Sequence, residues 1–284
     1  MMSYLQAGIL GVLQGITELF PISSLGHTVL LPTLLGWHLD QSAPEFVAFI
    51  VLTHLATALV LLGFFWRDWL HIIGDVLRTL VTRRISDEDT YGKLGWLIVV
   101  STIPVGLLGL LFQDQLAQLF AAPKLVAGVL VLNGVLLYGG EKLRTRAPEG
   151  KADDKALARL SWKQAIGIGI AECFALIPGF SRTGLTMTAS LYNGLTHGNS
   201  ARYAFLLATP IIFAASVLKV PDLFGSGAAA LGPSLFGAFC SAAAAYFSVR
   251  FLTNYFETKT LRPFAAYCVL AGALFLLHAL VVAF

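Results

Sequence analysis

The sequence predicts an all-α integral membrane protein with six transmembrane helices and two re-entrant helix–break–helix hairpins. Charged residues make up only 12% of the 284 residues and hydrophobic residues 57%, whereas a typical soluble domain has about 25% charged residues. Six apolar runs have roughly the 20 residues that a helix needs to cross the hydrocarbon core of a bilayer. Two further apolar segments are interrupted at their centres by proline and small polar residues, which does not fit a simple span.

The polar stretches between the apolar runs are too short to contain a soluble domain, so residues 1–284 are expected to form a single membrane domain. The longest of these stretches are 66–92 and 141–161, and both are rich in charged residues. The three cysteines are expected to be buried thiols, because their spacing fits neither a disulfide framework nor a zinc site. The expected spans are 44–65, 93–112, 123–140, 201–220, 231–251 and 262–283.

The two interrupted segments, 4–36 and 162–194, are expected to be re-entrant hairpins. The first is broken by Pro21-Ile22-Ser23-Ser24 and the second by Pro178-Gly179-Phe180-Ser181. Proline removes a helix donor and clashes with the preceding turn, and each remaining half is too short to cross the membrane alone. Because broken backbone is tolerated at membrane depth only inside protein or beside a wet cavity, the pattern indicates a site.

The two hairpins are also related in sequence by a shift of 158 residues, which places Gln14 on Glu172. Repeat one would cover residues 1–140 and repeat two residues 162–284, each with one hairpin followed by three spans. An odd number of spans turns the second repeat upside down, which is the inverted-topology plan of many transport folds. The identical pairs are Gln6/Gln164, Ala7/Ala165, Gly11/Gly169, Ser23/Ser181, Gly26/Gly184, Thr28/Thr186 and Gly36/Gly194.

The placement of lysine and arginine predicts the orientation of the chain. If 66–92 is cytoplasmic, sixteen of the nineteen Lys and Arg residues lie in or beside cytoplasmic loops, as the positive-inside rule requires. Both termini would then be outside, and the two hairpin tips would meet near the middle of the membrane. The net charge of +3 therefore reports orientation in the membrane; we expect membrane lipids as partners and no nucleic acid.

Ionisable residues within the apolar segments mark the expected site. Only Glu18 and Glu172 of the sixteen acidic residues lie well inside such segments, and Arg182 is the only comparably placed arginine. A charge at the bilayer centre costs about 2.5–3.5 kcal/mol on insertion scales. Each of these three ionisable residues is therefore expected to have a functional role. Simple ion pairs that pin the hairpins are the alternative, although buried pairs often fail to repay their desolvation.

The spacing of the polar residues predicts a phosphate site. Gln14 and Glu18 share one helix face at i, i+4, while Ser24 and His27 share the first turn after the first break. Backbone N–H groups at a helix start favour an anion, and an arginine fork binds phosphate oxygens. Carboxylates suit a hard divalent cation that bridges phosphate oxygens.

Two motifs carry a family resemblance. The run from Gln14 to His27 resembles the first signature of the undecaprenyl-diphosphate phosphatase (BacA) family, and the run from Glu172 to Thr186 resembles the second. The resemblance covers essentially the whole chain. It implies a bacterial plasma-membrane enzyme, dependent on a divalent cation and open to the extracytoplasmic side, that removes the terminal phosphate from the C55 lipid carrier and recycles it for cell-wall synthesis. Gln14 stands where many members have glutamate, Leu25 where Thr or Ser is common, and Thr183 where serine is commonest.

The residues and the resemblance together give a set of expected roles. Ser24 attacks phosphorus and His27 assists the proton transfers, although attack by water that Glu18 activates remains an alternative. Glu18, with Gln14 and Glu172, is expected to hold Mg²⁺ or Ca²⁺. The phosphate is expected at Ser23, Gly179, Ser181, Arg182, Thr183 and Thr186.

Three points stay open at this stage. A transporter or lipid flippase for a polyprenyl phosphate would also use inverted repeats with broken helices, but would not need the hydroxyl, histidine and carboxylate of Ser24, His27 and Glu18. His54, alone in an apolar run, is expected to be a hydrogen-bonded packing residue, with a place facing the cavity as the alternative. The chain is compatible with acting either alone or as a homodimer.

Overall fold

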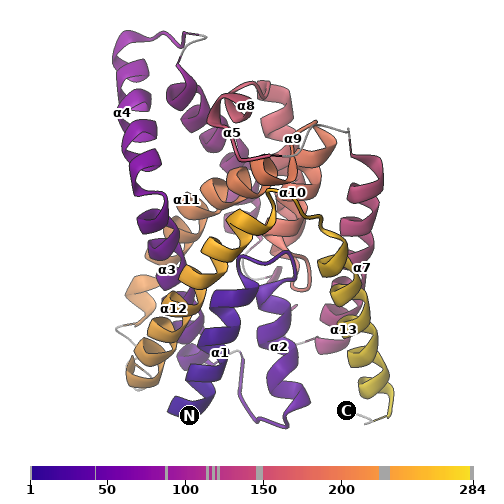
Figure 1. Cartoon of the computed structure of the whole chain (residues 1–284). Helices are drawn as coiled ribbons and strands as arrows, with labels where there is room; N and C mark the ends of the chain where they lie inside the picture. The colour runs from indigo at the N-terminus through magenta and orange to yellow at the C-terminus, as the bar shows by residue number, and fades with distance from the viewer. Residues whose placement is uncertain are drawn as a thin grey trace.

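A computed structural model of the chain describes residues 2–41, 43–86, 89–112, 115–116, 119, 122–144, 150–223 and 231–281, and this part is helical (Figure 1). The elements are α1 (Tyr4–Thr17), α2 (Ser24–Leu34), α3 (Pro44–Phe64), α4 (Trp66–Thr82), α5 (Thr90–Leu111), α7 (Pro123–Leu143), α8 (Asp154–Ala158), α9 (Trp162–Cys173), the 3₁₀ turn η1 (Phe174–Leu176), α10 (Arg182–Tyr192), α11 (His197–Leu223), α12 (Leu231–Tyr255) and α13 (Arg262–Val281).

Six of the helices are long and apolar enough to cross a membrane, which confirms the predicted number of spans. They coincide with the six apolar runs of the sequence to within a few residues. The candidate spans are Pro44–Phe64, Thr90–Leu111, Pro123–Leu143, His197–Lys219, Leu231–Tyr255 and Arg262–Ala279.

The two interrupted segments form helix–break–helix units, and their ends are built alike. Ser3 caps α1 and Ser161 caps α9, each in a reciprocal capping box with the glutamine three residues on. After the breaks, the Ser23 hydroxyl accepts from the Gly26 N–H at 3.2 Å, and Ser181 caps α10 in the same way through Gly184. These positions are related by the 158-residue shift, so the sequence similarity of the two segments is matched by the same local hydrogen bonds.

Glycines let the broken segments pack directly on long helices. A Cβ on Gly11 of α1 would lie 2.2 Å from the Gly237 carbonyl oxygen of α12, and one on Gly169 of α9 would lie 2.2 Å from the Ser101 carbonyl oxygen of α5. Small residues at helix interfaces allow such close backbone approach in membrane proteins. Each hairpin is thereby fixed against a span of the other half of the chain.

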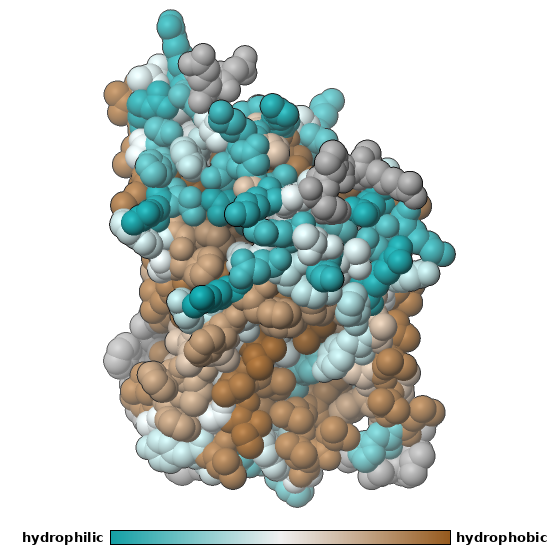
Figure 2. Space-filling view, in the orientation of Figure 1, coloured by the Kyte–Doolittle hydropathy of each residue, from teal (hydrophilic) through white to brown (hydrophobic). Residues whose placement is uncertain are grey.

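The surface divides into an apolar body and a polar end. Figure 2 shows hydrophilic residues gathered at the upper end, where α4 ends and α8 lies, and a broad hydrophobic belt below it. Arg202 of α11 ties this end together, with bonds of 2.6 and 3.0 Å to Asp154 of α8 and a 3.0 Å pair with Asp68 of α4. Both chain termini lie at the opposite end (Figure 1). This division indicates a multi-pass membrane protein.

Candidate active site

The two helix breaks meet in the interior and are joined by hydrogen bonds. The Ser181 hydroxyl donates to the Phe20 carbonyl at 3.4 Å, and the Thr183 hydroxyl donates to the Glu18 carbonyl at 3.2 Å. Asn133 of α7 binds both breaks: its side-chain N–H donates to the Pro21 carbonyl at 3.3 Å, and its oxygen accepts from the Ser181 N–H at 3.0 Å. Asn133 was not among the residues predicted for the site, since its only signal in the sequence is an amide within an apolar span.

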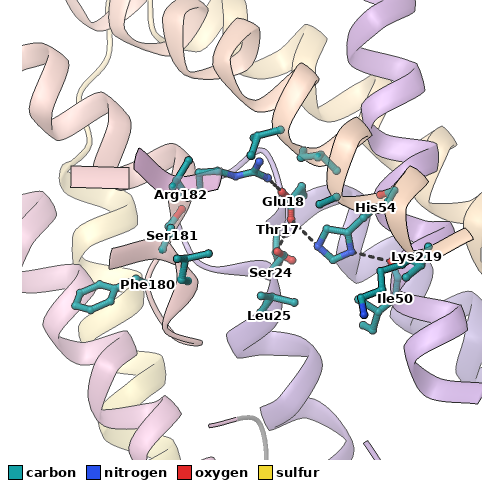
Figure 3. A pocket seen from close by; sticks show the side chains of 18 residues that line it. Thr17, Glu18, Ser24, Leu25, Ile50, His54, Phe180, Ser181, Arg182 and Lys219 are labelled. Carbon is teal, nitrogen blue, oxygen red and sulfur yellow. Dashed lines mark hydrogen bonds and ion pairs between the residues drawn. The ribbon is translucent and has the colours of Figure 1, made fainter. Parts of the chain in front are cut away.

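Glu18 is the centre of the resulting cluster (Figure 3). One carboxylate oxygen pairs with the Arg182 guanidinium, and the other accepts the Ser24 hydroxyl. The second oxygen also accepts from the Gln14 side-chain N–H at 3.0 Å and lies 3.4 Å from Nε2 of His54. Gln14 of α1, Ser24 at the start of α2 and Arg182 at the start of α10 are therefore held on a single buried carboxylate.

His54 enters this cluster from α3 and was expected to be a packing residue. Its Nδ1 lies 2.8 Å from the Ile50 carbonyl oxygen, which can only accept, so Nδ1 carries a proton and Nε2 faces Glu18. Nε2 therefore lies where it can exchange a proton with the carboxylate. The alternative considered at the sequence level, that His54 faces the cavity, is the one that the structure shows (Figure 3).

His27 lies outside the cluster around Glu18. Its Nδ1 donates to the Ser23 carbonyl at 2.7 Å, and its Nε2 is 2.7 Å from the hydroxyl of Tyr267 in α13, on whose ring it also stacks. The residues that line the cavity do not include His27. The structure therefore places a different histidine, His54, beside the carboxylate that binds Ser24, and the proton-transfer role of His27 stays a prediction.

A cavity of about 340 Å³ opens in front of the cluster. Of the residues predicted for the site, it is lined by Glu18, Ser24, Ser181 and Arg182. Lys219 of α11 also reaches it, and the sequence analysis had not selected this residue. Most of the remaining wall is apolar, so charged groups here interact through a medium of low polarity.

Several other predicted residues support the site without lining the cavity. Ser23 caps α2, and Thr183 fastens its helix to the carbonyl of Glu18. Gly179 has φ of +107°, which favours glycine, and a Cβ there would lie 2.5 Å from the Val126 carbonyl oxygen. Thr186 is buried one turn further along α10. Ser23 thus belongs to the first break and the other three residues to the second broken segment, and direct phosphate contact by them remains a prediction.

Gln14 and Glu172 bear on metal binding. The side-chain oxygen of Gln14 and both carboxylate oxygens of Glu172 are buried and lack a hydrogen-bond partner within the described part of the chain. In the part of the chain that the structure describes, no group of three or more His, Cys, Asp or Glu side chains is placed so that it could hold a metal ion. The oxygen donors fit a hard cation that takes one or two protein ligands and completes its shell with water and phosphate oxygens, as Mg²⁺ does.

Known proteins resemble the chain over nearly its whole length. The model of the family described as bacitracin resistance protein BacA matches residues 7–274, a range that includes every residue lining the cavity. An undecaprenyl-diphosphatase of Mycolicibacterium paratuberculosis is 47% identical over 293 residues, which cover 95% of each chain. Undecaprenyl-diphosphatase 2 of Frankia alni is 41% identical over 334 residues, covering 96% of this chain and 97% of the relative. Undecaprenyl-diphosphatase 1 of Burkholderia pseudomallei is 47% identical over 264 residues, covering 93% and 92%.

Proposed function

The chain belongs to the BacA family, and on that basis we propose that it hydrolyses undecaprenyl diphosphate to undecaprenyl phosphate and inorganic phosphate. One observation carries the assignment: a hydroxyl, a carboxylate and a guanidinium are bonded together at a cavity between two broken helices. Hydrolysis of an anhydride needs a nucleophile, a proton acceptor and a counter-charge for the phosphoryl group, and this cluster provides all three.

Arg182 binds the terminal phosphate. Its guanidinium has five N–H donors in a planar fork, so it keeps its contact with Glu18 while other N–H groups hold phosphate oxygens. The backbone N–H groups at the start of α10 add partial positive charge from the same direction. The binding group and the base are thus fixed relative to each other before the substrate arrives, which favours reaction.

Ser24 attacks the terminal phosphorus. Its proton passes to Glu18 as the Oγ–P bond forms, and the bridging P–O bond breaks with its electron pair leaving on undecaprenyl phosphate. Water then attacks the phosphorus of phospho-Ser24 and gives a proton to the departing phosphate, while Glu18 returns the first proton to Oγ. His54 supports Glu18 through its Nε2, which lies 3.4 Å from the carboxylate and can exchange protons with it.

A divalent cation fits the same site as a resident ion. Glu18 and the unpartnered oxygen of Gln14 would hold it, with Glu172 as a further oxygen donor. When bound, such an ion neutralises negative charge on the diphosphate oxygens. Loss of activity in a chelator, and its recovery with Mg²⁺ or Ca²⁺ but not with monovalent ions, tests this assignment.

The site lies within the membrane in a defined orientation. In this arrangement the two broken segments re-enter the membrane from opposite sides as inverted repeats, and the cavity opens to the extracytoplasmic side of the bacterial plasma membrane. The shared capping pattern of the two segments supports the repeat. The gathering of polar residues at the end opposite the termini supports the orientation (Figure 2). A lipid flippase is not favoured, because transport alone does not require a serine hydroxyl on a buried carboxylate.

Release of inorganic phosphate from undecaprenyl diphosphate by purified protein in detergent tests the function. We expect Ser24→Ala to lose at least about 1,000-fold in kcat, since it removes the nucleophile. Ser23→Ala is the matched control: it loses the α2 cap, costs about 1 kcal/mol of stability and keeps most of the activity.

Rapid quenching during turnover decides whether the route is covalent. Labelled terminal phosphate should be found on Ser24 in the wild-type protein and not in Ser24→Ala. If no phosphoserine is trapped and a chiral terminal phosphate is released with inversion, water attacks directly and Glu18 acts as its base. Absence of phosphate release from the wild-type protein would contradict the proposed function itself.

A further inference from the structure

A second, larger cavity lies beside the catalytic one. It has a volume of about 1030 Å³ and is formed by α4, α5 and α11, with a wall that is almost wholly apolar. The two cavities share wall residues, so they adjoin each other within the structure. The residues that line both are Val105, Leu176, Ile211, Ala215 and Lys219.

The two long helices that border the larger cavity, α5 and α11, are joined by a hydrogen-bonded contact. The Ser101 hydroxyl of α5 lies 2.8 Å from the hydroxyl of Tyr203 in α11, which also donates to the Leu97 carbonyl at 3.3 Å. Beyond this contact, α5 contains Pro104 and α11 contains Pro210. A proline inside a helix removes one backbone hydrogen bond and favours a bend. Both helices border the cavity, α5 with residues between Gly95 and Leu110 on both sides of its proline, and α11 with residues between Pro210 and Lys219.

The helices α3 and α12, which correspond to α11 and α5 in the other half of the chain, are in close contact. Shifting by 158 residues relates α3 to α11, and α12 occupies the place in repeat two that α5 has in repeat one. Here Ser241 of α12 bonds both Thr57 Oγ1 and the Thr53 carbonyl, each at 3.1 Å. A Cβ on Gly237 would lie 2.4 Å from the ring of Phe49, so these helices are in close contact. Within the described part of the chain, the larger cavity is thus bordered by the α5–α11 pair, whereas α3 and α12 are closely packed.

We propose that this lateral cavity holds the first isoprene units of the substrate's polyprenyl chain while the diphosphate occupies the catalytic cavity. This inference rests on the proposed function. The shared wall gives a continuous path from an apolar compartment to Ser24 and Arg182, which matches a molecule with a hydrocarbon chain and an anionic head. Lys219 stands where the two compartments meet, beside the position of the phosphate that stays on the lipid.

The cavity acts by orientation and not by hydrophobic affinity. A prenyl chain in the bilayer is already surrounded by hydrocarbon, so moving it against apolar side chains yields little net free energy of transfer. What it gains is a fixed direction for the chain, which holds the terminal phosphorus in line with Ser24. Filling the cavity should therefore slow the hydrolysis of the long-chain substrate and leave the chemistry at the diphosphate unchanged.

Gly106 of α5 offers a direct test. It lines the lateral cavity but not the catalytic one, and a Cβ there would meet no atom nearer than Ile211 Cδ1 at 3.9 Å. A phenylalanine side chain can thus enter the cavity without a backbone clash. Gly128 of α7 is the matched control, because a Cβ there has nothing within 4 Å and it lines neither cavity.

The measurement is kcat/KM of the full-length protein in detergent for undecaprenyl diphosphate and for dimethylallyl diphosphate, which has one isoprene unit. Gly106→Phe should lower kcat/KM for undecaprenyl diphosphate at least tenfold and should change kcat/KM for dimethylallyl diphosphate less than twofold. Gly128→Phe should leave kcat/KM unchanged for both substrates. Equal loss on both substrates, or loss on neither, overturns the inference and leaves bulk lipid as the occupant. Those results would leave phosphate release by the wild-type protein, and hence the proposed function, intact.

A second measurement uses a long-chain diphosphate whose first isoprene units carry a photoreactive diazirine. Cross-links should fall on α5 and α11 beyond Pro104 and Pro210, and Gly106→Phe should abolish them. Cross-links confined to α3 and α12, or no cross-links to the protein, would overturn the inference. This readout does not depend on turnover, so it separates a misplaced tail from an inactive enzyme.

Discussion

Glu18 shows how a single carboxylate organises the site at the scale of residues. Its two oxygens bind Arg182, Ser24 and Gln14 and face His54, and these four residues come from four different helices. A buried carboxylate with so many partners is costly to disturb, since removing it leaves several polar groups without a bond. The site is thus organised before substrate binds.

The two histidines give a prediction at this scale. We expect His54→Gln to lower kcat by about 100-fold, because it removes the imidazole that can exchange protons with Glu18. His27→Gln should lose much less, since its ring is bonded to Ser23 and Tyr267 outside the cavity. Phosphate-release kinetics on both variants at equal expression provides the measurement. A larger loss in His27→Gln would restore the catalytic role assigned to His27 from the sequence.

At the scale of elements, backbone contact between broken and continuous helices holds the hairpins. The α9–α5 contact combines the close approach at Gly169 with a 2.8 Å bond from the Ser101 hydroxyl to the Ala165 carbonyl. The same serine meets Tyr203 of α11. The position of the second break, and with it Arg182, therefore depends on how closely α9 can approach α5.

Two glycines on α9 provide a matched pair for this contact. Gly169→Ala should destabilise the protein by about 1–3 kcal/mol, because its Cβ would overlap the backbone of α5. Gly167→Ala should be neutral or stabilising by up to about 1 kcal/mol, because its Cβ has open space and alanine is the better helix former. Thermal unfolding of both variants in one detergent measures the difference. Equal melting temperatures would show that the close approach does not limit stability.

At the scale of the whole molecule, the polar end and the termini define an axis. Ion pairs of Arg202 gather α4, α8 and α11 at the polar end, and the termini lie at the other (Figure 1). The excess of Lys and Arg in the polar loops predicts that this end is cytoplasmic.

Cysteine labelling in intact cells tests this orientation. In a background where Cys173, Cys240 and Cys268 are replaced by alanine, Asp40→Cys should react with a membrane-impermeant thiol reagent. Ser86→Cys and Gly150→Cys should react only after the membrane is opened, which also shows that these sites are reactive. The reverse pattern would invert the orientation and place the catalytic cavity on the cytoplasmic side.

The amino-acid sequence by itself determined the six long helices, the two breaks, and Glu18, Ser24 and Arg182 as chemically exceptional residues. These features follow from local physics: a span needs a long apolar run, proline stops a helix, and charge in an apolar segment is costly. Only the tertiary structure decided which groups meet. His54 and His27 are both single histidines in apolar surroundings, and the packing of α3 and α13 brings one to Glu18 and the other to Tyr267. The contacts of Asn133, the place of Lys219 and the cavity bordered by α5 and α11 likewise depend on helices distant in sequence, because partner choice across a bundle is set by side-chain packing that local periodicity does not contain.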